Sequence, residues 1–145
     1  MIPRRAQFLG HWIDHCGWFP DYVERLVSRG RGRFDTCLAH ESLNIDGRVG
    51  QLSHPILHYT DPHLFHYFEK LNRYTSLAAL DLSRRKRRAT IWDLCTRPPV
   101  TFLKMYLIRR GFLDGMHGFV LSLFSSFSVF VKYAKLWEIH EGIGR

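Results

Sequence analysis

The dipeptide His40-Glu41 is one place where this chain could carry out acid–base chemistry. It follows an apolar-rich segment at residues 34–39, so we expect Glu41 at the end of a strand, beside a loop. A carboxylate in that position can accept a proton from a hydroxyl nucleophile within hydrogen-bond reach. On the dipeptide alone, the commoner role of Glu41 is a solvated surface residue, because functional carboxylates with perturbed pKa values are the minority.

Histidines are concentrated in a short segment near the middle of the chain. Four of them surround an aspartate: His54, His58, His63 and His66, with Asp61. Neutral imidazole and carboxylate groups can bind a divalent ion. Pro55 and Pro62 interrupt any single helix that would align all four histidines, so the pattern does not favour a dedicated zinc site. It is compatible with one histidine beside a metal that is associated with a substrate.

Two further groups of residues could bind a sugar or its phosphates. Lys70, Arg73 and Tyr74 lie about one turn apart on an expected helix, where they could hold a pyrophosphate and stack on a sugar or base. The same residue types on a helix surface more often meet only solvent. Trp18 and Asp21 belong to an aromatic turn at residues 17–21, which is either a sugar platform or an ordinary packed corner.

The strongest electrostatic feature is a run of consecutive cations at residues 84–88. It consists of Arg84, Arg85, Lys86, Arg87 and Arg88. Such a run attracts anionic lipid headgroups by about 1 kcal/mol per charge. Charge alone would suit nucleic acid equally well, but no helix-turn-helix, zinc finger or aromatic RNA-binding signature accompanies it. We therefore expect a membrane-surface partner and no nucleic acid, with the last helix as a second attachment element.

The elements that must position these residues differ between the two parts of the chain. Residues 1–60 contain frequent glycines and no sustained helical period, which predicts short strands and loops. Asp46-Gly47 stands between two short apolar segments and predicts a hairpin turn there. Residues 61–145 carry helical signals and are expected to form three or four helices.

The helix boundaries can be predicted from capping residues and breakers. Asp61 can cap a first helix that ends near Leu82 and has Pro62 at its first position. Pro98-Pro99 should interrupt the next segment, which leaves a helix over residues 100–110 that stops at a glycine.

The last helix is predicted over residues 114–140, with Gly142 just beyond its end. Its apolar residues lie on almost every side up to Val131. That part should therefore be buried in protein or set into lipid.

Length and composition restrict the class of protein. A chain of 145 residues that is 46% hydrophobic can bury one core, which excludes global disorder. Lysine and arginine outnumber aspartate and glutamate by 21 to 13, and the formal charge of +8 suits an anionic partner. The three cysteines are widely spaced and form no C-x-x-C, so we expect reduced thiols in a cytoplasmic protein. No apolar stretch of a secretory signal follows the amino terminus.

Several sequence blocks resemble, in their order along the chain, the carboxy-terminal half of bacterial family 2 glycosyltransferases. Among these, the lipopolysaccharide core glucosyltransferases are the most similar group. The blocks are F-L-G-H-W-I at 8–13, G-W-F-P-D-Y at 17–22, H-E-S-L at 40–43, N-R-Y-T at 72–75, G-F-L-D-G at 111–115 and K-Y-A-K-L-W-E at 132–138. These blocks are distributed over nearly the whole chain, from residue 8 to residue 138.

The resemblance implies an inverting transfer from a nucleotide-diphospho-sugar to a glycan acceptor of the lipopolysaccharide core or a similar one, either free or lipid-linked. It implies an α/β fold of GT-A type, of which this chain would be an α+β fragment. Residues 1–60 would form the acceptor side with the catalytic base, and residues 61–145 the helical, membrane-proximal portion. The protein would lie peripherally at the inner face of the cytoplasmic membrane.

The resemblance also implies roles for single residues. Glu41 matches the general base that deprotonates the acceptor, and His58 matches a contact to the metal or the diphosphate. Substrate binding is expected from Trp18, Asp21, His40, Lys70, Arg73 and Tyr74. The segment Lys70-x-x-Arg73-Tyr74 differs, however, in two of three positions from the Gln-x-x-Arg-Trp motif of processive relatives.

One family feature is absent from the sequence. Family members carry an Asp-x-Asp that coordinates the Mg or Mn ion of the sugar nucleotide, and no two aspartates here are separated by a single residue. We therefore expect that this chain alone does not bind the donor and is a fragment, a truncated reading frame or one piece of a split enzyme whose amino-terminal half is separate. The alternative is a non-catalytic module that binds a membrane surface or a partner through residues 84–88 and the last helix.

Overall fold

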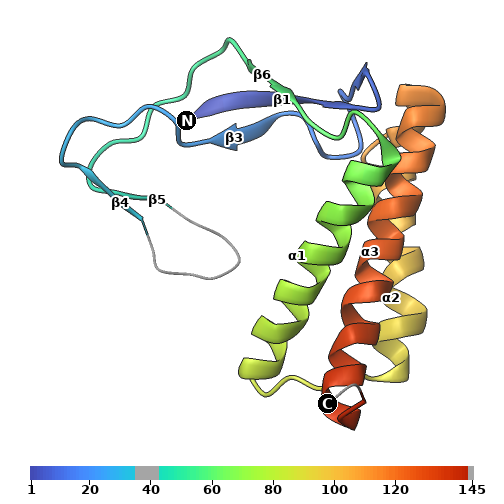
Figure 1. Cartoon of the computed structure of the whole chain (residues 1–145). Coiled ribbons are helices and arrows are strands. Elements are labelled where there is room, and N and C mark those ends of the chain that lie inside the picture. The colour runs from blue at the N-terminus through green and yellow to red at the C-terminus, as the bar shows by residue number, and fades with distance from the viewer. Residues whose placement is uncertain (35–42, 144–145) are drawn as a thin grey trace.

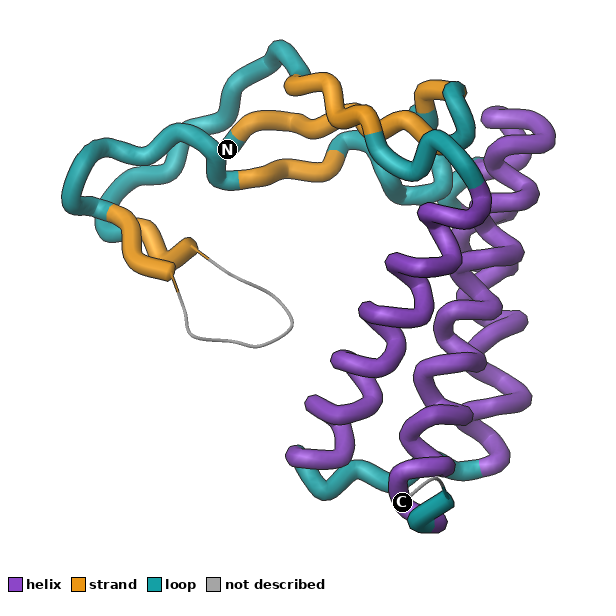
Figure 2. The backbone as a smooth tube through the Cα atoms, in the orientation of Figure 1, coloured by secondary structure: helices purple, strands orange, loops and turns teal. Residues whose placement is uncertain are grey.

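The computed structural model describes residues 1–34 and 43–143, and it joins a strand-containing arm to a bundle of helices. The arm extends sideways from one end of the bundle (Figure 1). Strands occupy the first part of the chain and helices the second, with the change between Tyr59 and Leu64 (Figure 2). The α+β class that the sequence predicted is confirmed.

The larger sheet is built around β1 (Ile2–Phe8). It pairs antiparallel with β2 (His11–Trp12) and β3 (Asp21–Val23), and parallel with β6 (Ile56–Tyr59). Ala6 and Phe8 are buried on one face of β1, as alternate residues of a strand are. The register places Arg4 opposite both Asp21 and Ile56, so three strands meet beside this arginine.

The predicted hairpin around Asp46-Gly47 is wrong. The strand before it, β5 (Leu43–Ile45), pairs instead with the earlier strand β4 (Gly32–Phe34). The Asp46 amide donates a hydrogen bond back to Arg31 O at 2.9 Å. The chain that follows continues without forming a strand and bonds to the amino terminus, where Leu52 N donates to Met1 O at 2.9 Å. The segment before Gly47 therefore bonds to the chain near Arg31, and the segment after it bonds to the amino terminus, so the two do not pair with each other.

Helix α1 (Leu64–Arg84) begins later than the sequence predicted. Its N-cap is His63, whereas Asp61 has a positive φ of 46° and directs its carboxylate to side chains further along the helix. The expected capping role of Asp61 is therefore wrong. The helix buries Leu71, Thr75 and Ala79, which are spaced by four residues and form the stripe that faces α3.

Helix α2 (Ile91–Leu103) runs through Pro98-Pro99, so the predicted interruption is wrong. Thr90 and Asp93 form a capping box that starts the helix well before the prolines. Interior prolines remove helical hydrogen bonds, but α2 lies along α3, and Ser126 Oγ on α3 donates to Pro98 O at 2.7 Å. Packing against α3 offsets the loss, and α2 continues into a π-helical turn, η1 (Lys104–Ile108).

The last helix agrees with its prediction to within one residue at each end. A short 3-10 turn, η2 (Gly111–Asp114), leads into α3 (Gly115–Glu141). Gly142 caps the end of α3 in the left-handed conformation, with φ 69°. Figure 1 shows α3 beside both α1 and α2.

Two clusters of buried residues hold these elements together. The first joins the sheet to α3 through Phe8, Ile13, Cys16 and Leu121. The second, nearer the carboxyl end of α3, joins α1 to α3 through Ala79, Tyr133 and Leu136.

Candidate functional site

A cavity of about 470 Å³ lies where the larger sheet meets α1. Its size falls in the usual range for small-ligand sites. It brings together five of the residues selected from the sequence, namely Trp18, Asp21, His58, Lys70 and Tyr74. The other residues of its wall are Arg4, Ala6, Gly17, Thr60 and Asp61. We refer to it as the polar cavity.

One side of the polar cavity is formed by the ion pair of Arg4 and Asp21. Arg4 Nε donates to Asp21 Oδ2 at 2.9 Å, and Arg4 Nη2 contacts the same oxygen. The two residues are opposite each other across β1 and β3, so strand register sets their contact. Both side chains are partly exposed, which leaves the second carboxylate oxygen of Asp21 accessible to a ligand hydroxyl.

The opposite side is organised by Asp61, a residue that the sequence analysis did not assign to the site. Its carboxylate is only 6% exposed and accepts a hydrogen bond from Lys70 Nζ at 2.9 Å, with His66 Nδ1 at 3.3 Å. Lys70 Nζ also donates to Thr60 Oγ1 at 2.7 Å. The sequence does place Asp61 among histidines and nine residues before Lys70, which could have indicated a site residue. Its position directly before Pro62 instead suggested that it caps a helix.

His58 lies on β6 between these two charged pairs. Partial burial, and then the nearby cations Arg4, Lys70 and Arg25, lower the pKa of His58 below its ordinary value. The imidazole is therefore neutral at pH 7, where one ring nitrogen donates a hydrogen bond and the other accepts one. It can contact hydroxyl or phosphate oxygens of a ligand.

Trp18 and Tyr74 supply aromatic surface on the cavity wall. Trp18 is half-buried, with the edge of its ring against Phe8 at a centroid distance of 6.1 Å. Tyr74 is 55% exposed on α1. The sharp turn before Trp18 requires positive φ values at Cys16 and Gly17, of 59° and 78°. That turn directs the tryptophan to the cavity.

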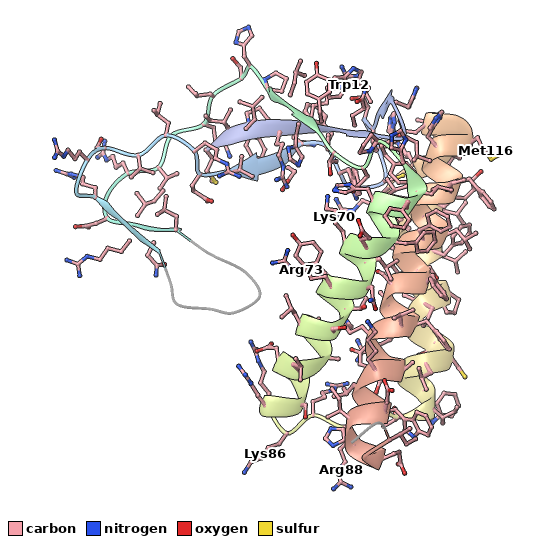
Figure 3. The ribbon with its side chains drawn as sticks, in the orientation of Figure 1. Trp12, Lys70, Arg73, Lys86, Arg88 and Met116 are labelled. Atoms are coloured by element: carbon pink, nitrogen blue, oxygen red, sulfur yellow. The ribbon has the colours of Figure 1, made fainter. Side chains whose placement is uncertain are left out.

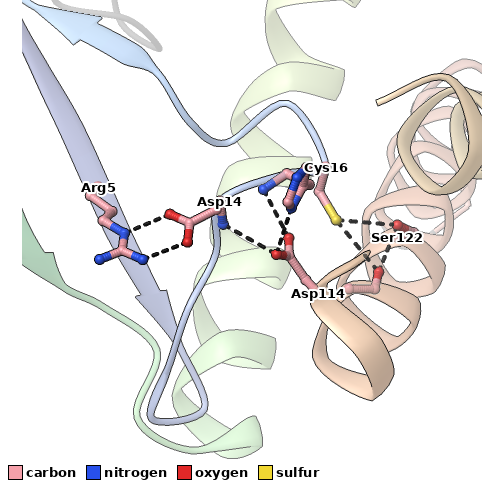
Figure 4. Close-up of polar contacts among 7 residues, drawn as sticks. Arg5, Asp14, Cys16, Asp114 and Ser122 are labelled. Atoms are coloured by element: carbon pink, nitrogen blue, oxygen red, sulfur yellow. Dashed lines mark hydrogen bonds and ion pairs between the residues drawn. The ribbon is translucent and has the colours of Figure 1, made fainter. Parts of the chain in front are cut away.

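The turn is fixed to the helices by Asp114 at the end of η2. The Asp114 carboxylate accepts hydrogen bonds from the backbone of His15 at 2.9 Å and of Asp14 at 3.4 Å, and contacts His15 Nδ1 at 2.9 Å (Figure 4). Hydrogen bonding from Arg5 lowers the pKa of Asp14, and burial raises the pKa of the Cys16 thiol. The thiol packs against Ser122 on α3, so these contacts position the turn that carries Trp18.

Among the described residues, one predicted substrate-binding residue does not line the polar cavity. Arg73 is exposed on α1 on the side that faces the arm, beside Lys70 (Figure 3). His40 and Glu41 lie outside the described residues. Within residues 1–34 and 43–143, no three His, Cys, Asp or Glu side chains are grouped as a metal site requires. The fit of a divalent cation to the described residues is therefore poor.

The basic run lies at the end of the bundle farthest from the arm, where Figure 3 labels Lys86 and Arg88. Two of its five cations are used within the fold: Arg85 pairs with Asp81 at 2.9 Å, and Arg87 with Asp93 at 3.3 Å. The remaining three, Arg84, Lys86 and Arg88, pair with no carboxylate of the described part of the chain.

The outer face of α3 exposes large apolar side chains along its length. Met116, Leu123, Phe127, Phe130 and Trp137 are each more than 40% exposed and share one face by their spacing. Among the described residues, the segment Gly111–Glu141 is the one helical stretch long and apolar enough to cross a membrane, and 28% of its most apolar window is buried. Core helices of soluble proteins satisfy the same criterion.

The polar cavity has the chemistry of a carbohydrate site. Its two cations are each compensated by a carboxylate, so it offers hydrogen-bond donors and acceptors without a strong net charge. Aromatic rings beside such groups provide apolar surface for the faces of sugar rings. This balance suits the hydroxyl groups of a glycan better than the high charge of a free diphosphate.

Comparison with known proteins identifies similar chains among glycosyltransferases. The lipopolysaccharide core biosynthesis glycosyltransferase LpsC of Rhizobium meliloti is 27% identical over 96% of this chain and 52% of its own length. Uncharacterized glycosyltransferases of Rickettsia prowazekii and Rickettsia typhi are each 30% identical over 72% of this chain and 36% of their own lengths. No family model matches the chain. No solved structure matches it either.

The chain spans about half the length of LpsC and about a third of the rickettsial proteins. These names confirm the resemblance to glycosyltransferases of the lipopolysaccharide core. The chain is similar to bacterial glycosyltransferases, among them one of lipopolysaccharide core biosynthesis.

Proposed function

We propose that this chain is the acceptor-binding portion of an inverting glycosyltransferase of family 2 and GT-A type. The complete enzyme would transfer a sugar from a nucleotide-diphospho-sugar to a glycan of the lipopolysaccharide core or a similar acceptor. The observation that carries the proposal is the polar cavity, whose wall combines Trp18 and Tyr74 with two carboxylate–cation pairs. The named function of LpsC supports the choice of acceptor.

In this proposal, Glu41 is the general base. Direct displacement at the sugar requires one carboxylate near the attacking hydroxyl to remove its proton, and a general base accelerates such a step by roughly 10²- to 10⁴-fold. The residues of the polar cavity orient the acceptor: carboxylate oxygens of Asp21 and Asp61 accept hydrogen bonds from its hydroxyls, and neutral His58 donates or accepts one. The proton of the attacking hydroxyl moves to the Glu41 carboxylate.

We further propose that donor binding depends on residues outside this chain. The sequence has no Asp-x-Asp, and a Mg or Mn ion for the donor diphosphate would find no group of three ligands among the described residues. Isothermal titration of the chain with UDP-sugars and manganese should therefore give no micromolar binding. Binding of that strength would contradict a separate donor half.

The catalytic role is tested in a complete enzyme, either a full-length homologue or this chain reconstituted with an amino-terminal half. Glu41→Gln should reduce turnover by roughly 10²-fold or more while donor affinity stays unchanged. Glu69→Gln on α1 is the matched control, because Glu69 is an exposed carboxylate outside the polar cavity. Turnover retained in Glu41→Gln would refute the role of Glu41.

A second candidate function is attachment to an anionic membrane surface at the inner face of the cytoplasmic membrane, with or without catalysis. Two observations favour it: the exposed apolar face of α3, and three cations of the basic run without carboxylate partners among the described residues. Apolar insertion and lipid electrostatics together are what a peripheral protein requires.

The membrane proposal is tested by sedimentation with phosphatidylcholine vesicles that contain or lack phosphatidylglycerol. Binding should require the anionic lipid, weaken with salt, and weaken in the triple variant Arg84→Gln, Lys86→Gln, Arg88→Gln. The control carries Arg29→Gln, Arg33→Gln and Arg48→Gln, which remove the same charge from exposed positions on the arm. Equal loss in both triple variants would show that net charge alone, and no basic-run site, is responsible.

A further inference from the structure

A second cavity, of about 340 Å³, forms a groove between α1 and α3. Most of its wall is apolar. It is lined on α1 by Tyr67, Leu71, Thr75 and Ala78, and on α3 by Val129 and Lys132. We refer to it as the helix groove. The proposed function above gives it no role.

The helix groove exists because α1 and α3 are packed tightly only above and below it. The cluster around Phe8 and Leu121 closes the bundle toward the sheet, with Tyr67 against it. The cluster of Ala79, Tyr133 and Leu136 closes it toward the basic end. Between them several facing side chains are small, and a gap remains that is large enough for a ligand; the small ones are Thr75, Ala78, Ser128 and Val129.

Polar contacts hold the two helices at this separation. Lys135 Nζ on α3 lies within hydrogen-bond distance of four oxygens of α1: Asn72 Oδ1 at 2.6 Å, Asn72 O and Ser76 Oγ each at 2.8 Å, and Thr75 Oγ1 at 3.0 Å. These bonds fix the register of α1 against α3 beside the groove. The width of the groove is therefore set by the contacts that hold α1 and α3 together.

The helix groove adjoins the polar cavity. Asp61, Lys70 and Tyr74 belong to the walls of both. A ligand can therefore place polar groups among the charged pairs of one cavity and an apolar group between the helices of the other. A molecule with a polar part and a separate apolar part is an amphiphile, and this is the class of ligand that the two cavities together would suit.

The groove also contains a cation without an acidic partner. Lys132 is half-buried, its Nζ lies 4.8 Å from the centroid of the Tyr133 ring, and it pairs with no carboxylate within residues 1–34 and 43–143. By contrast, Lys70 at the shared wall is compensated by Asp61. An anionic group of a ligand would supply the missing partner of Lys132.

We propose that the helix groove binds the hydrocarbon chain of an amphiphile with a phosphate head group, and that the phosphate pairs with Lys132. Where the polar cavity holds a glycan acceptor, which rests on the proposed function, the same molecule fills both cavities and the acceptor is a lipid-linked glycan phosphate. The groove volume is at the lower end of small-ligand sites, which fits one alkyl chain and is too small for a peptide helix.

The chain as it exists is titrated calorimetrically with octyl, decyl and dodecyl phosphate below their micelle concentrations, and with inorganic phosphate. Affinity should rise with chain length, by up to about fourfold for each methylene group that the groove buries. Inorganic phosphate should bind at least a hundredfold more weakly than dodecyl phosphate. Affinity independent of chain length, or equal binding of inorganic phosphate, would overturn the proposal.

Two variants locate the binding. Ala78→Phe fills the groove and should abolish the dependence on chain length, whereas Leu80→Phe adds the same ring at an exposed position of α1 outside the groove and should preserve it. Lys132→Met keeps the apolar stem and should weaken dodecyl phosphate at least tenfold while neutral dodecyl maltoside is little affected. Unchanged binding in both Ala78→Phe and Lys132→Met would place the alkyl chain elsewhere.

The outcomes separate this proposal from the proposed function, because the titration involves no sugar transfer. Alkyl phosphate binding that is lost in Ala78→Phe supports the groove whether or not a glycan binds the polar cavity. Glycan binding without alkyl phosphate binding leaves the proposed function intact and refutes the groove.

Discussion

Asp61 links the two cavities at the level of a single residue. It is 4% exposed, has a positive φ, and its carboxylate contacts Lys70 and His66. A buried carboxylate requires hydrogen-bond donors, and charged donors stabilise it most. Asp61 is the charged partner that holds Lys70 in both cavity walls, together with the hydroxyl of Thr60.

Asp61→Asn removes the charge and keeps the size of the side chain. We expect it to lower the free energy of unfolding by roughly 2 kcal/mol, because Lys70 loses its charged partner. Asp81→Asn is the matched control: Asp81 forms an exposed ion pair with Arg85, worth less than about 0.5 kcal/mol. Urea unfolding of both variants measures the difference, and equal losses would contradict a special role of Asp61.

Several residues that were selected from the sequence come together in the structure, but the contacts between them were not predicted. Trp18, Asp21, Lys70 and Tyr74 were selected because their chemical types suit sugar binding, and all four line the polar cavity. The role of Arg4 was missed because it follows from strand register, which brings residues 4 and 21 opposite each other. The contacts of Asp61 depend on the path of the chain into α1, which short-range capping signals did not predict.

At the scale of elements, the crossing of η2 and α3 depends on two glycines. A Cβ atom at Gly118 would lie 1.9 Å from Gly111 O, and one at Gly111 would lie 2.7 Å from Cys16 Sγ. The backbones therefore approach as closely as they do only because both side chains are absent. This contact also sets the position of Asp114, which holds the turn that carries Trp18.

Gly118→Ala should destabilise the protein by at least about 1–3 kcal/mol, since the added methyl group collides with backbone that cannot rotate away. Gly50→Ala provides the control, because a Cβ there has no neighbour within 4 Å and the φ of Gly50 is not in the left-handed region. Thermal unfolding should show a lower midpoint for Gly118→Ala only. A midpoint equal to that of Gly50→Ala would contradict the close approach.

The start of α2 depends on Asp93, which is 5% exposed. Burial raises its pKa, but hydrogen bonds from Arg97 and Thr90 outweigh this and lower the pKa to about 2 from 3.8. The ionised carboxylate therefore stabilises the folded state by roughly 2 kcal/mol above pH 3.8, and this contribution is lost as the pH falls from 3.8 to about 2.

Asp93→Asn should consequently be less stable than the natural chain by a constant amount between pH 7 and pH 5. The difference in the free energy of unfolding should narrow below pH 3.8, where the natural chain loses the charged form. Urea unfolding at a series of pH values measures this. If the difference in the free energy of unfolding stayed constant from pH 7 down to about pH 2, the loss of stability in Asp93→Asn would come from the shape of the side chain and not from its charge.

Element boundaries were predictable where local signals agree with packing. The apolar run and Gly142 located α3 within one residue, because both its burial and its cap are encoded in its own segment. Pro98-Pro99 misled the prediction for α2, since contact with α3 overrides the local cost of proline. Asp46-Gly47 misled the prediction of a hairpin because the partner of β5 precedes it in the chain.

At the scale of the whole molecule, large apolar side chains are exposed on all three α-helices, and contiguous exposed apolar patches mark interaction surfaces. Two apolar surfaces have distinct proposed partners: the outer face of α3 contacts a membrane, and the helix groove holds an alkyl chain. Both proposals accord with a chain that spans about half the length of LpsC.

The central claim is that the polar cavity binds a glycan. Saturation-transfer difference NMR of this chain with a delipidated lipopolysaccharide core oligosaccharide tests it most directly. The account predicts signals from sugar protons that persist in Phe65→Ala, an exposed aromatic residue of α1 outside the cavity, and disappear in Tyr74→Ala. No transfer to the oligosaccharide, or transfer that is unchanged in Tyr74→Ala, would contradict it.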